Sequence, residues 1–314
     1  MYAIAVDALK GEPRLLEVAQ PVAKPDQLLV KIAATAINPF DWKVADGIMG
    51  TAPTVFPLIL GQDAAGTVIA TGASVTRFKI GDRIFGQFFH MPIGEGTFAQ
   101  YAVVPQTAPL VLLPTQIDFA TGAALPTAGM TALAMVEALE LREQASVLIV
   151  GATGGVGSFA TQIAASRGLH VLATAGAPGD AERLRQLGAR EIYGSRDGAL
   201  ISDVQRSHPG GIDAVIDLVS NAAALTAVTG LVRRGGWVLT TVFSADEKAL
   251  QARGLRGGNF EVKATSTLLQ RLADLVAAGK LTVPIESTIS LPDAPAAIAR
   301  SRAGHSKGKT VIVP

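Results

Sequence analysis

Cysteine is absent from this chain of 314 residues. Its absence excludes disulfides, thiolate nucleophiles and every zinc site built on cysteine. Histidine is also scarce, and the four histidines show none of the short spacings typical of metal ligands along a sequence. We therefore expect no metal ion. The histidines are His90, His170, His208 and His305.

Charge is sparse as well, at 17% of residues with a net charge of +1. No cluster of lysine and arginine forms the basic footprint of a nucleic-acid-binding protein, so we expect no nucleic-acid partner. Residues 1–7 lack a basic segment and reach an acid before any apolar run develops, which predicts no export signal and a cytoplasmic protein. Residues 144–166 carry no charged side chain but hold several glycines at their centre, which favours a buried strand, turn and helix over a membrane span.

The chain is long enough for two domains. Up to about residue 116, short β-prone runs broken by proline and glycine predict a small β domain, with strands near 28–32, 66–70 and 98–104. Apolar strands then alternate with helices, which predicts a doubly wound parallel sheet and an α/β class. Its expected strands are 146–150, 170–174, 191–193, 213–217, 237–242 and 260–264. The last segment, with helices near 268–278 and 294–302 and a strand at 310–313, is expected to return to the first domain.

A glycine-rich turn follows the expected strand 146–150 and leads directly into a helix. Backbone N–H groups at a helix N-terminus bind the pyrophosphate of a dinucleotide. Glycine at Gly154 lets the phosphates approach, and glycine at Gly157 lets helix and strand pack closely. No lysine follows, which excludes a Walker-type loop, although Ala152 stands where the usual fingerprint has glycine. The predicted pyrophosphate contacts are Gly154, Gly155, Val156 and Gly157.

The second strand of this unit indicates which dinucleotide binds. In such folds it commonly ends in an acid that binds the adenosine 2′-hydroxyl, whereas this one ends in Thr174, Ala175 and Gly176. No carboxylate is present to repel a 2′-phosphate, so the sequence favours NADPH over NADH. Three arginines are either partners of that phosphate or solvated surface charges: Arg183, Arg185 and Arg196.

Five segments occur in an order and spacing that resembles the medium-chain dehydrogenase/reductase superfamily. Besides the glycine turn they are Asn-Pro-Phe-Asp-Trp-Lys at 38–43, Leu-Gly-Gln-Asp-Ala-Ala-Gly at 60–66, Gly-Asp-Arg-Ile-Phe-Gly at 81–86 and Pro-Thr-Ala-Gly-Met-Thr-Ala at 126–132. Within the superfamily they are most similar to the zinc-free quinone oxidoreductases, which are ζ-crystallin-like, and to the enone reductases.

That resemblance implies a GroES-like β-rich catalytic domain made of residues 1–118 and 265–314, and a Rossmann dinucleotide-binding domain of residues 119–264. It also implies an active site between them and hydride transfer from NADPH to quinones or α,β-unsaturated carbonyls. Relatives are commonly homodimers, which here would pair through the expected edge strand 260–264. The alternative is a non-catalytic NADP(H)-binding redox sensor or structural protein of the same fold.

The resemblance also bears on zinc. Zinc-dependent relatives have a cysteine near the position of Asn38 and a Gly-His-Glu motif near the segment Gly61-Gln62-Asp63. Neither the cysteine nor the histidine is present here. A zinc-independent mechanism is therefore expected.

Without a metal, hydrogen-bond donors must stabilise the oxygen on which charge develops during reduction. Asn38 and Lys43 are the candidate donors, and Asp41 either orients Lys43 or leads a proton relay. Asn38 alternatively caps a turn, Asp41 alternatively caps a short helix, and Asp63 either binds substrate or holds its loop. In quinone reductases a tyrosine often stands at the position of Lys43, whereas lysine is closer to the enone-reductase pattern.

The resemblance further places one group of residues around the nicotinamide. Ligands of parallel α/β sheets lie at the carboxyl ends of the strands, which agrees with this placement. The group comprises Thr127, Thr131, Leu218, Val219, Val242 and Phe243.

Overall fold

The computed structural model describes residues 1–195, 198–304 and 306–314. It divides into two compact units, of which unit 1 comprises Met1–Met130 with Ala264–Pro314 and unit 2 comprises Thr131–Lys263. The first boundary lies later than the expected one at residue 118, because helix α2 (Phe119–Ala124) packs against the sheet of unit 1. The boundary falls within helix α3 (Pro126–Ala138).

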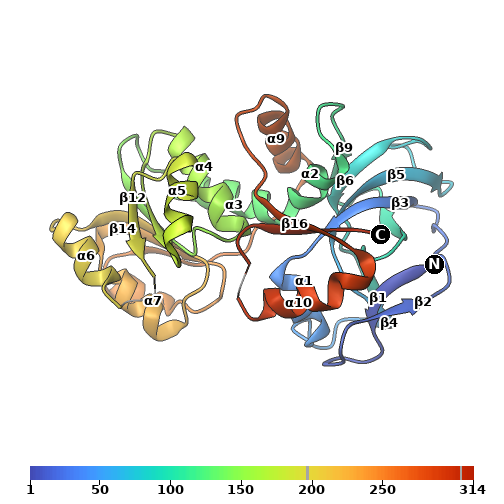
Figure 1. Cartoon of the computed structure of the whole chain (residues 1–314), viewed down its shortest axis with the longest axis horizontal. Helices are drawn as coiled ribbons and strands as arrows, with labels where there is room; N and C mark the ends of the chain where they lie inside the picture. Colours follow the sequence, from blue (N-terminus) through green and yellow to red (C-terminus); the bar gives the residue numbers. More distant parts are fainter. Residues whose placement is uncertain (196–197, 305) are drawn as a thin grey trace. The chain divides into compact units, whose positions relative to one another are not determined.

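Unit 1 contains two sheets (Figure 1). The seven-stranded sheet has the order β16-β17-β3-β5-β6-β9, with β8 also paired to β3. Its strands are β3 (Gln27–Ala36), β5 (Asp63–Thr71), β6 (Arg83–Gln87), β8 (Tyr101–Pro105), β9 (Leu110–Leu112), β16 (Ile285–Ser290) and β17 (Lys309–Val313). The four-stranded sheet has the order β2-β1-β4-β7, with β1 (Tyr2–Val6), β2 (Arg14–Glu17), β4 (Thr54–Ile59) and β7 (Ile93–Glu95).

The end of the chain completes the larger sheet of unit 1. Strand β17 runs antiparallel to β3, where Val311 pairs with Ala36 and Ile312 with Thr35. The expectation that the last segment returns to the first domain is thus confirmed. The helices of this segment are α9 (Ser266–Ala277) and α10 (Ala294–Arg302), with a short 3-10 helix η1 (Leu291–Asp293) before α10. Residues from both ends of the chain share one apolar core, including Ile4, Leu58, Phe98, Ile298 and Ile312.

Unit 2 is a six-stranded parallel sheet of order β12-β11-β10-β13-β14-β15. This confirms the doubly wound sheet. In Figure 1 helices α4 and α5 lie on one side of its strands, and α6 and α7 on the other. Its strands are β10 (Ser146–Val150), β11 (His170–Ala175), β12 (Glu191–Gly194), β13 (Ile212–Asp217), β14 (Val232–Thr240) and β15 (Arg256–Asn259). Its helices are α4 (Gly155–Ser166), α5 (Pro178–Gln186), α6 (Leu200–Ser207), α7 (Ala222–Thr229) and α8 (Glu247–Ala252).

The last strand of this sheet differs from the expected one. Residues 260–264 form no strand, and the edge is instead β15, a glycine-containing segment. A Cβ atom at Gly257 would lie 2.2 Å from the carbonyl oxygen of Val238 on β14. The close approach of the two strands therefore requires glycine, whereas the apolar alternation of 260–264 made that segment the better strand by pattern alone.

The strands of unit 2 are parallel, so their carboxyl ends lie along one side of the sheet and their amino ends along the opposite side. Val150, Asp217 and Thr240 pair in one row at the carboxyl ends of their strands, next to the glycine turn. At the amino ends, Ser146 pairs with His170. Among the described residues, no helix combines the length and the apolar character needed to cross a membrane.

Candidate functional site

The candidate site residues of unit 1 begin where β3 ends. Helix α1 (Pro39–Ala45) starts at a proline, whose fixed backbone suits the first helical position. Asn38 is its N-cap, and the carboxylate of Asp41 accepts a hydrogen bond from the backbone N–H of Asn38 at 2.7 Å. Asp41 thus contributes to the cap of α1, as the sequence allowed, and this contact leaves its proposed part in proton transfer open. It also accepts the backbone N–H of Gln62 and does not orient Lys43.

The amide of Asn38 joins a cation to an anion inside unit 1. Lys309 donates from Nζ to Asn38 Oδ1 at 2.5 Å and to the carbonyl of Ile37 at 2.8 Å. Asn38 in turn donates from Nδ2 to Asp63 Oδ2 at 2.9 Å, and more weakly to the carbonyl of Ala36 at 3.4 Å. Lys309, Asn38 and Asp63 are 2%, 3% and 0% exposed. Both amide hydrogens of Asn38 are therefore directed to acceptors of the protein itself.

Asp63 connects this group to the start of helix α3. Its carboxylate accepts from the backbone N–H of Thr127 at 3.0 Å and from the Thr127 hydroxyl at 2.6 Å. The hydroxyl of Thr127 also accepts from the side-chain amides of Gln62 and Gln87, at 3.1 and 2.9 Å. A carboxylate at a helix N-terminus is favoured by the unpaired N–H groups and by the helix dipole. The carboxylate of Asp63, at the start of β5, is thus held by hydrogen bonds from Asn38 and from Thr127.

Burial dominates the titration of the three charged groups. Burial raises the pKa of Asp41 from 3.8 to about 8, against hydrogen bonds that lower it. Burial likewise raises the pKa of Asp63 above 3.8, opposed first by the positive charge of Lys309. The pKa of Lys309 is lowered by burial, opposed by Asp63 and Asp41. At neutral pH Asp41 therefore keeps its proton, while Asp63 and Lys309 are linked through the amide of Asn38.

A small pocket opens to solvent beside Asp41. Its lining includes Phe40 and Phe89, whose rings meet edge to face with centroids 5.3 Å apart. His90 also lines it. Lys43 lies apart from the buried group, half-exposed, with its ammonium 5.6 Å from the ring centroid of Trp42.

In unit 2 the glycine turn leads from β10 directly into helix α4. Gly151 adopts φ +84°, a left-handed conformation that favours glycine. A Cβ atom at Gly157 would lie 2.3 Å from the carbonyl of Gly151, so close packing requires glycine there. At Gly154 a Cβ atom would meet only the carbonyl of Gly151 at 3.5 Å, which leaves open space in front of the helix. The first N–H groups of α4, at Gly155 and Val156, have no partner within the helix and suit an anion.

The end of β11 supports this turn. The hydroxyl of Thr174 accepts a hydrogen bond from the N–H of Gly151 at 3.0 Å, and Thr174 is 3% exposed. Ala175 and Gly176, which follow it, are half-buried. On the next helix, α5, the guanidinium of Arg183 donates to the carbonyl of Thr153 at 2.8 Å and so lies on the turn.

The other two arginines are placed differently. Arg185 is exposed and pairs at 3.8 Å with Glu182. Arg196 lies outside the described residues. Of the two candidate arginines that the structure describes, Arg183 is therefore the one that contacts the turn. Sequence position alone did not distinguish Arg183 from Arg185, since both lie on the same short helix.

The remaining cofactor candidates lie near the carboxyl edge of unit 2. Val219 and Phe243 follow β13 and β14 and are 63% and 62% exposed, which is unusual for apolar side chains. Phe243 has φ +56°, a strained conformation for a bulky residue. Leu218 and Val242 are half-buried next to them, and Thr131 is buried within α3. Most of the predicted cofactor-binding residues of unit 2 thus lie at the carboxyl ends of its strands.

Replacing Lys309 with methionine is expected to lower the free energy of unfolding by about 3–5 kcal/mol, because the buried Asp63 loses its cation. Urea unfolding of Lys309→Met measures this. The matched control is Lys280→Met at an exposed lysine, which should change stability by less than about 0.5 kcal/mol. Equal stability of the two variants would contradict a charge-compensating role for Lys309.

Asp41 should make stability fall as pH rises. Its pKa is 3.8 in the unfolded chain and about 8 in the folded one, so the folded state binds more protons between these values. Asp63 acts in the same direction. The Asp41→Asn variant should therefore show a shallower loss of unfolding free energy between about pH 5 and about pH 8. Urea unfolding at several pH values tests this, with exposed Asp26→Asn as the control. Identical slopes in wild type and Asp41→Asn would refute it.

Two family models match the chain. The alcohol dehydrogenase GroES-like domain matches residues 24–115, and the zinc-binding dehydrogenase model matches residues 187–312. The chain is also 33% identical to the quinone-oxidoreductase homolog, chloroplastic, of Spinacia oleracea, over 100% of this chain and 96% of the relative.

Solved structures agree with these matches. The quinone oxidoreductase from Coxiella burnetii superposes with a TM-score of 0.88 at 27% identity, over 100% of this chain and 99% of the other. The Escherichia coli quinone oxidoreductase complexed with NADPH gives a TM-score of 0.88 over 100% of both chains, and its 21% identity supports the fold alone. The predicted fold class and resemblance are both confirmed. The chain belongs to the quinone oxidoreductases of the medium-chain dehydrogenase/reductase superfamily.

Proposed function

We propose that this protein is an NADPH-dependent oxidoreductase that transfers hydride to quinones or α,β-unsaturated carbonyls. The observation that carries the proposal is the similarity along the whole chain to a quinone-oxidoreductase homolog. The end of β11, which carries no acid, supports NADPH as the cofactor. The proposal includes a homodimer that pairs through the edge strand β15, and a cytoplasmic location.

The residues of unit 2 fit NADPH. The N–H groups at the start of α4 would hold the pyrophosphate, in front of the open space at Gly154. Arg183, on the turn, is the proposed partner of the adenosine 2′-phosphate, and Thr174 acts by holding Gly151 in place. The exposed Val219 and Phe243 would contact the nicotinamide side. When bound, NADPH supplies the hydride.

The pocket of unit 1 is the proposed acceptor site. The crossed rings of Phe40 and Phe89 suit a flat conjugated molecule, since aromatic faces pack well against one another. Asp41 lines the same pocket and keeps its proton up to a pH of about 8, because burial raises its pKa. We assign Asp41 as the proton donor to the reduced acceptor, with Lys43 as a second donor from the same helix.

Asn38 and Asp63 then act by positioning rather than by contact with the acceptor. Their polar atoms are used by one another, by Lys309 and by Thr127. In the zinc-dependent relatives, metal ligands stand near Asn38 and Asp63. Here the ammonium of Lys309 supplies a positive charge beside them, which supports a zinc-independent reaction.

An acceptor screen tests the proposal. Purified protein should oxidise NADPH in the presence of a small quinone or alkenal, with a higher kcat/KM than for NADH, and chelators should not lower the initial rate at temperatures where the protein is folded. Absorbance of the reduced nicotinamide reports the reaction. Tight NADPH binding without turnover of any acceptor would contradict the proposal and favour the redox-sensor alternative.

Arg183→Met should lower kcat/KM for NADPH by about tenfold to a hundredfold, since a hydrogen bond to a charged group contributes about 1.5–3 kcal/mol. Activity with NADH should change little. Arg185→Met, on the same helix but exposed, is the matched control. A loss of equal size with both cofactors would mean that Arg183 supports the turn and does not read the 2′-phosphate.

A further inference from the structure

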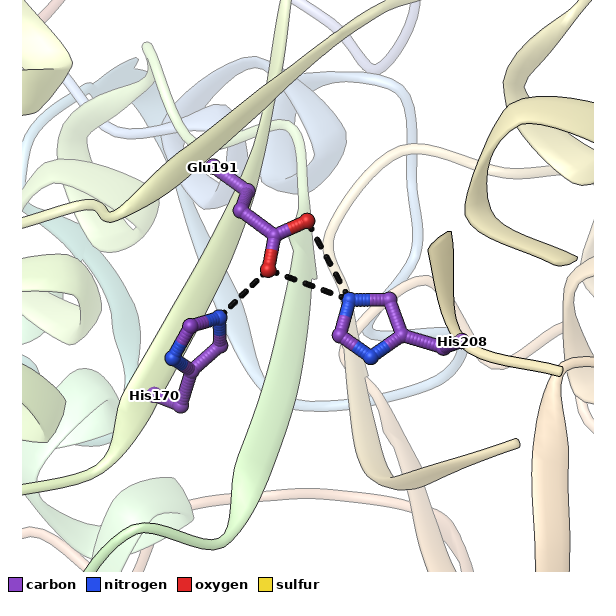
Figure 2. Close-up of side chains that lie close together, drawn as sticks. All are labelled: His170, Glu191 and His208. Atoms are coloured by element: carbon purple, nitrogen blue, oxygen red, sulfur yellow. Dashed lines mark hydrogen bonds and ion pairs between the residues drawn. The ribbon is translucent and has the colours of Figure 1, made fainter. Parts of the chain in front are cut away.

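Three side chains of unit 2 converge away from the proposed NADPH site. They are His170 at the start of β11, Glu191 at the start of β12 and His208 directly after α6. Figure 2 shows the two imidazole rings approaching one carboxylate from different sides. His170 Nε2 lies 2.5 Å from Glu191 Oε1, and His208 Nε2 lies 3.1 and 3.2 Å from the two carboxylate oxygens.

The cluster lies at the amino ends of the strands of unit 2, whereas the glycine turn lies at their carboxyl ends. His170 and Glu191 begin parallel strands, whereas the turn and the residues around it follow the carboxyl ends of such strands. Strand β11 alone spans roughly 17 Å between its first and last Cα atoms, at about 3.3 Å per residue. The cluster is therefore separate from the residues that would hold NADPH.

Two imidazoles and a carboxylate form a ligand set that suits zinc and similar transition-metal ions. All three ligand atoms lie within 4.8 Å of one another. Ligands at about 2.0–2.2 Å from a tetrahedral ion lie roughly 3.3–3.6 Å apart, so small side-chain rotations suffice to admit the ion. The side chains of His170, Glu191 and His208 are 30%, 28% and 20% exposed, which leaves the group accessible from solvent.

A fourth residue holds the carboxylate. The hydroxyl of Tyr193, on the same strand as Glu191, donates to Glu191 Oε2 at 2.5 Å. Metal-binding carboxylates are commonly fixed by such an outer hydrogen bond. This contact leaves Oε1, the oxygen closest to both histidines, as the atom available to an ion.

We propose that His170, Glu191 and His208 bind one divalent transition-metal ion of the Zn²⁺ type. Three protein ligands leave the remaining coordination to water. The ion would tie β11, β12 and the segment between α6 and β13 together, and so stabilise unit 2. Ion binding displaces the protons that the imidazole Nε2 atoms share with the carboxylate.

Calorimetric titration of the full-length protein with Zn²⁺, after treatment with a chelator and its removal, tests the proposal. We expect one ion per chain and a higher Tm in its presence. Co²⁺ in place of Zn²⁺ should give the visible absorption of a low-symmetry site with nitrogen and oxygen ligands. None of these measurements depends on turnover, so the outcome is independent of the proposed reaction.

Three variants locate the ion. His170→Ala, His208→Asn and Glu191→Gln should each weaken Zn²⁺ binding by at least about tenfold. Glu191→Gln keeps the size of the side chain and a hydrogen-bond acceptor for Tyr193, so it remains informative if an alanine variant fails to fold. The control is His90→Ala, because His90 faces a single carboxylate, Glu95, at 3.7 Å. The His90→Ala variant should keep the wild-type affinity for Zn²⁺.

The proposal is overturned if the wild-type protein binds no Zn²⁺ in the titration. It is equally overturned if binding is unchanged in folded Glu191→Gln and His208→Asn, since the ion would then lie elsewhere. Circular dichroism of each variant establishes that it is folded. In either case the three side chains form a hydrogen-bonded cluster only.

Discussion

The arrangement of unit 1 around its pocket depends on one buried positive charge. The ammonium of Lys309 reaches the end of β3 and, through the amide of Asn38, the carboxylate of Asp63. Removing an ion from water costs several kcal/mol, which an opposite charge and good hydrogen bonds must offset. The network supplies both. Burial raises the pKa of both carboxyl groups, that of Asp41 to about 8, and the positive charge of Lys309 opposes the rise at each.

Local signals were sufficient for the parts of the fold that repeat a general pattern. The strand, glycine turn and helix from Ser146 to Ser166 could be predicted, because each step has a local steric or hydrogen-bonding cause. The strand at the sheet edge could not, since the need for glycine at Gly257 comes from the backbone of β14 rather than from its own neighbours. The alternation of apolar and charged residues favoured residues 260–264, which follow β15, as the edge strand.

The candidate sites show the same limit more clearly. Asn38 and Asp41 were identified from their own segment, whereas Lys309 was missed because it contacts Asn38 from 271 residues away. The only local sign was a lysine at the start of an otherwise apolar strand. The histidines had no regular spacing, and only the parallel register of β11 and β12 brings His170 to Glu191. Tertiary contacts of this kind leave no periodic signal in the sequence.

The position of Lys309 along the chain has a consequence for biosynthesis. Unit 2 is one continuous stretch and has all of its strands as soon as Lys263 has been made. Unit 1 starts first but lacks its counter-charge and strand β17 until residues 309–313 have been made. Asn38 and Asp63 therefore lack their cation at the stage of synthesis when all the strands of unit 2 are already complete.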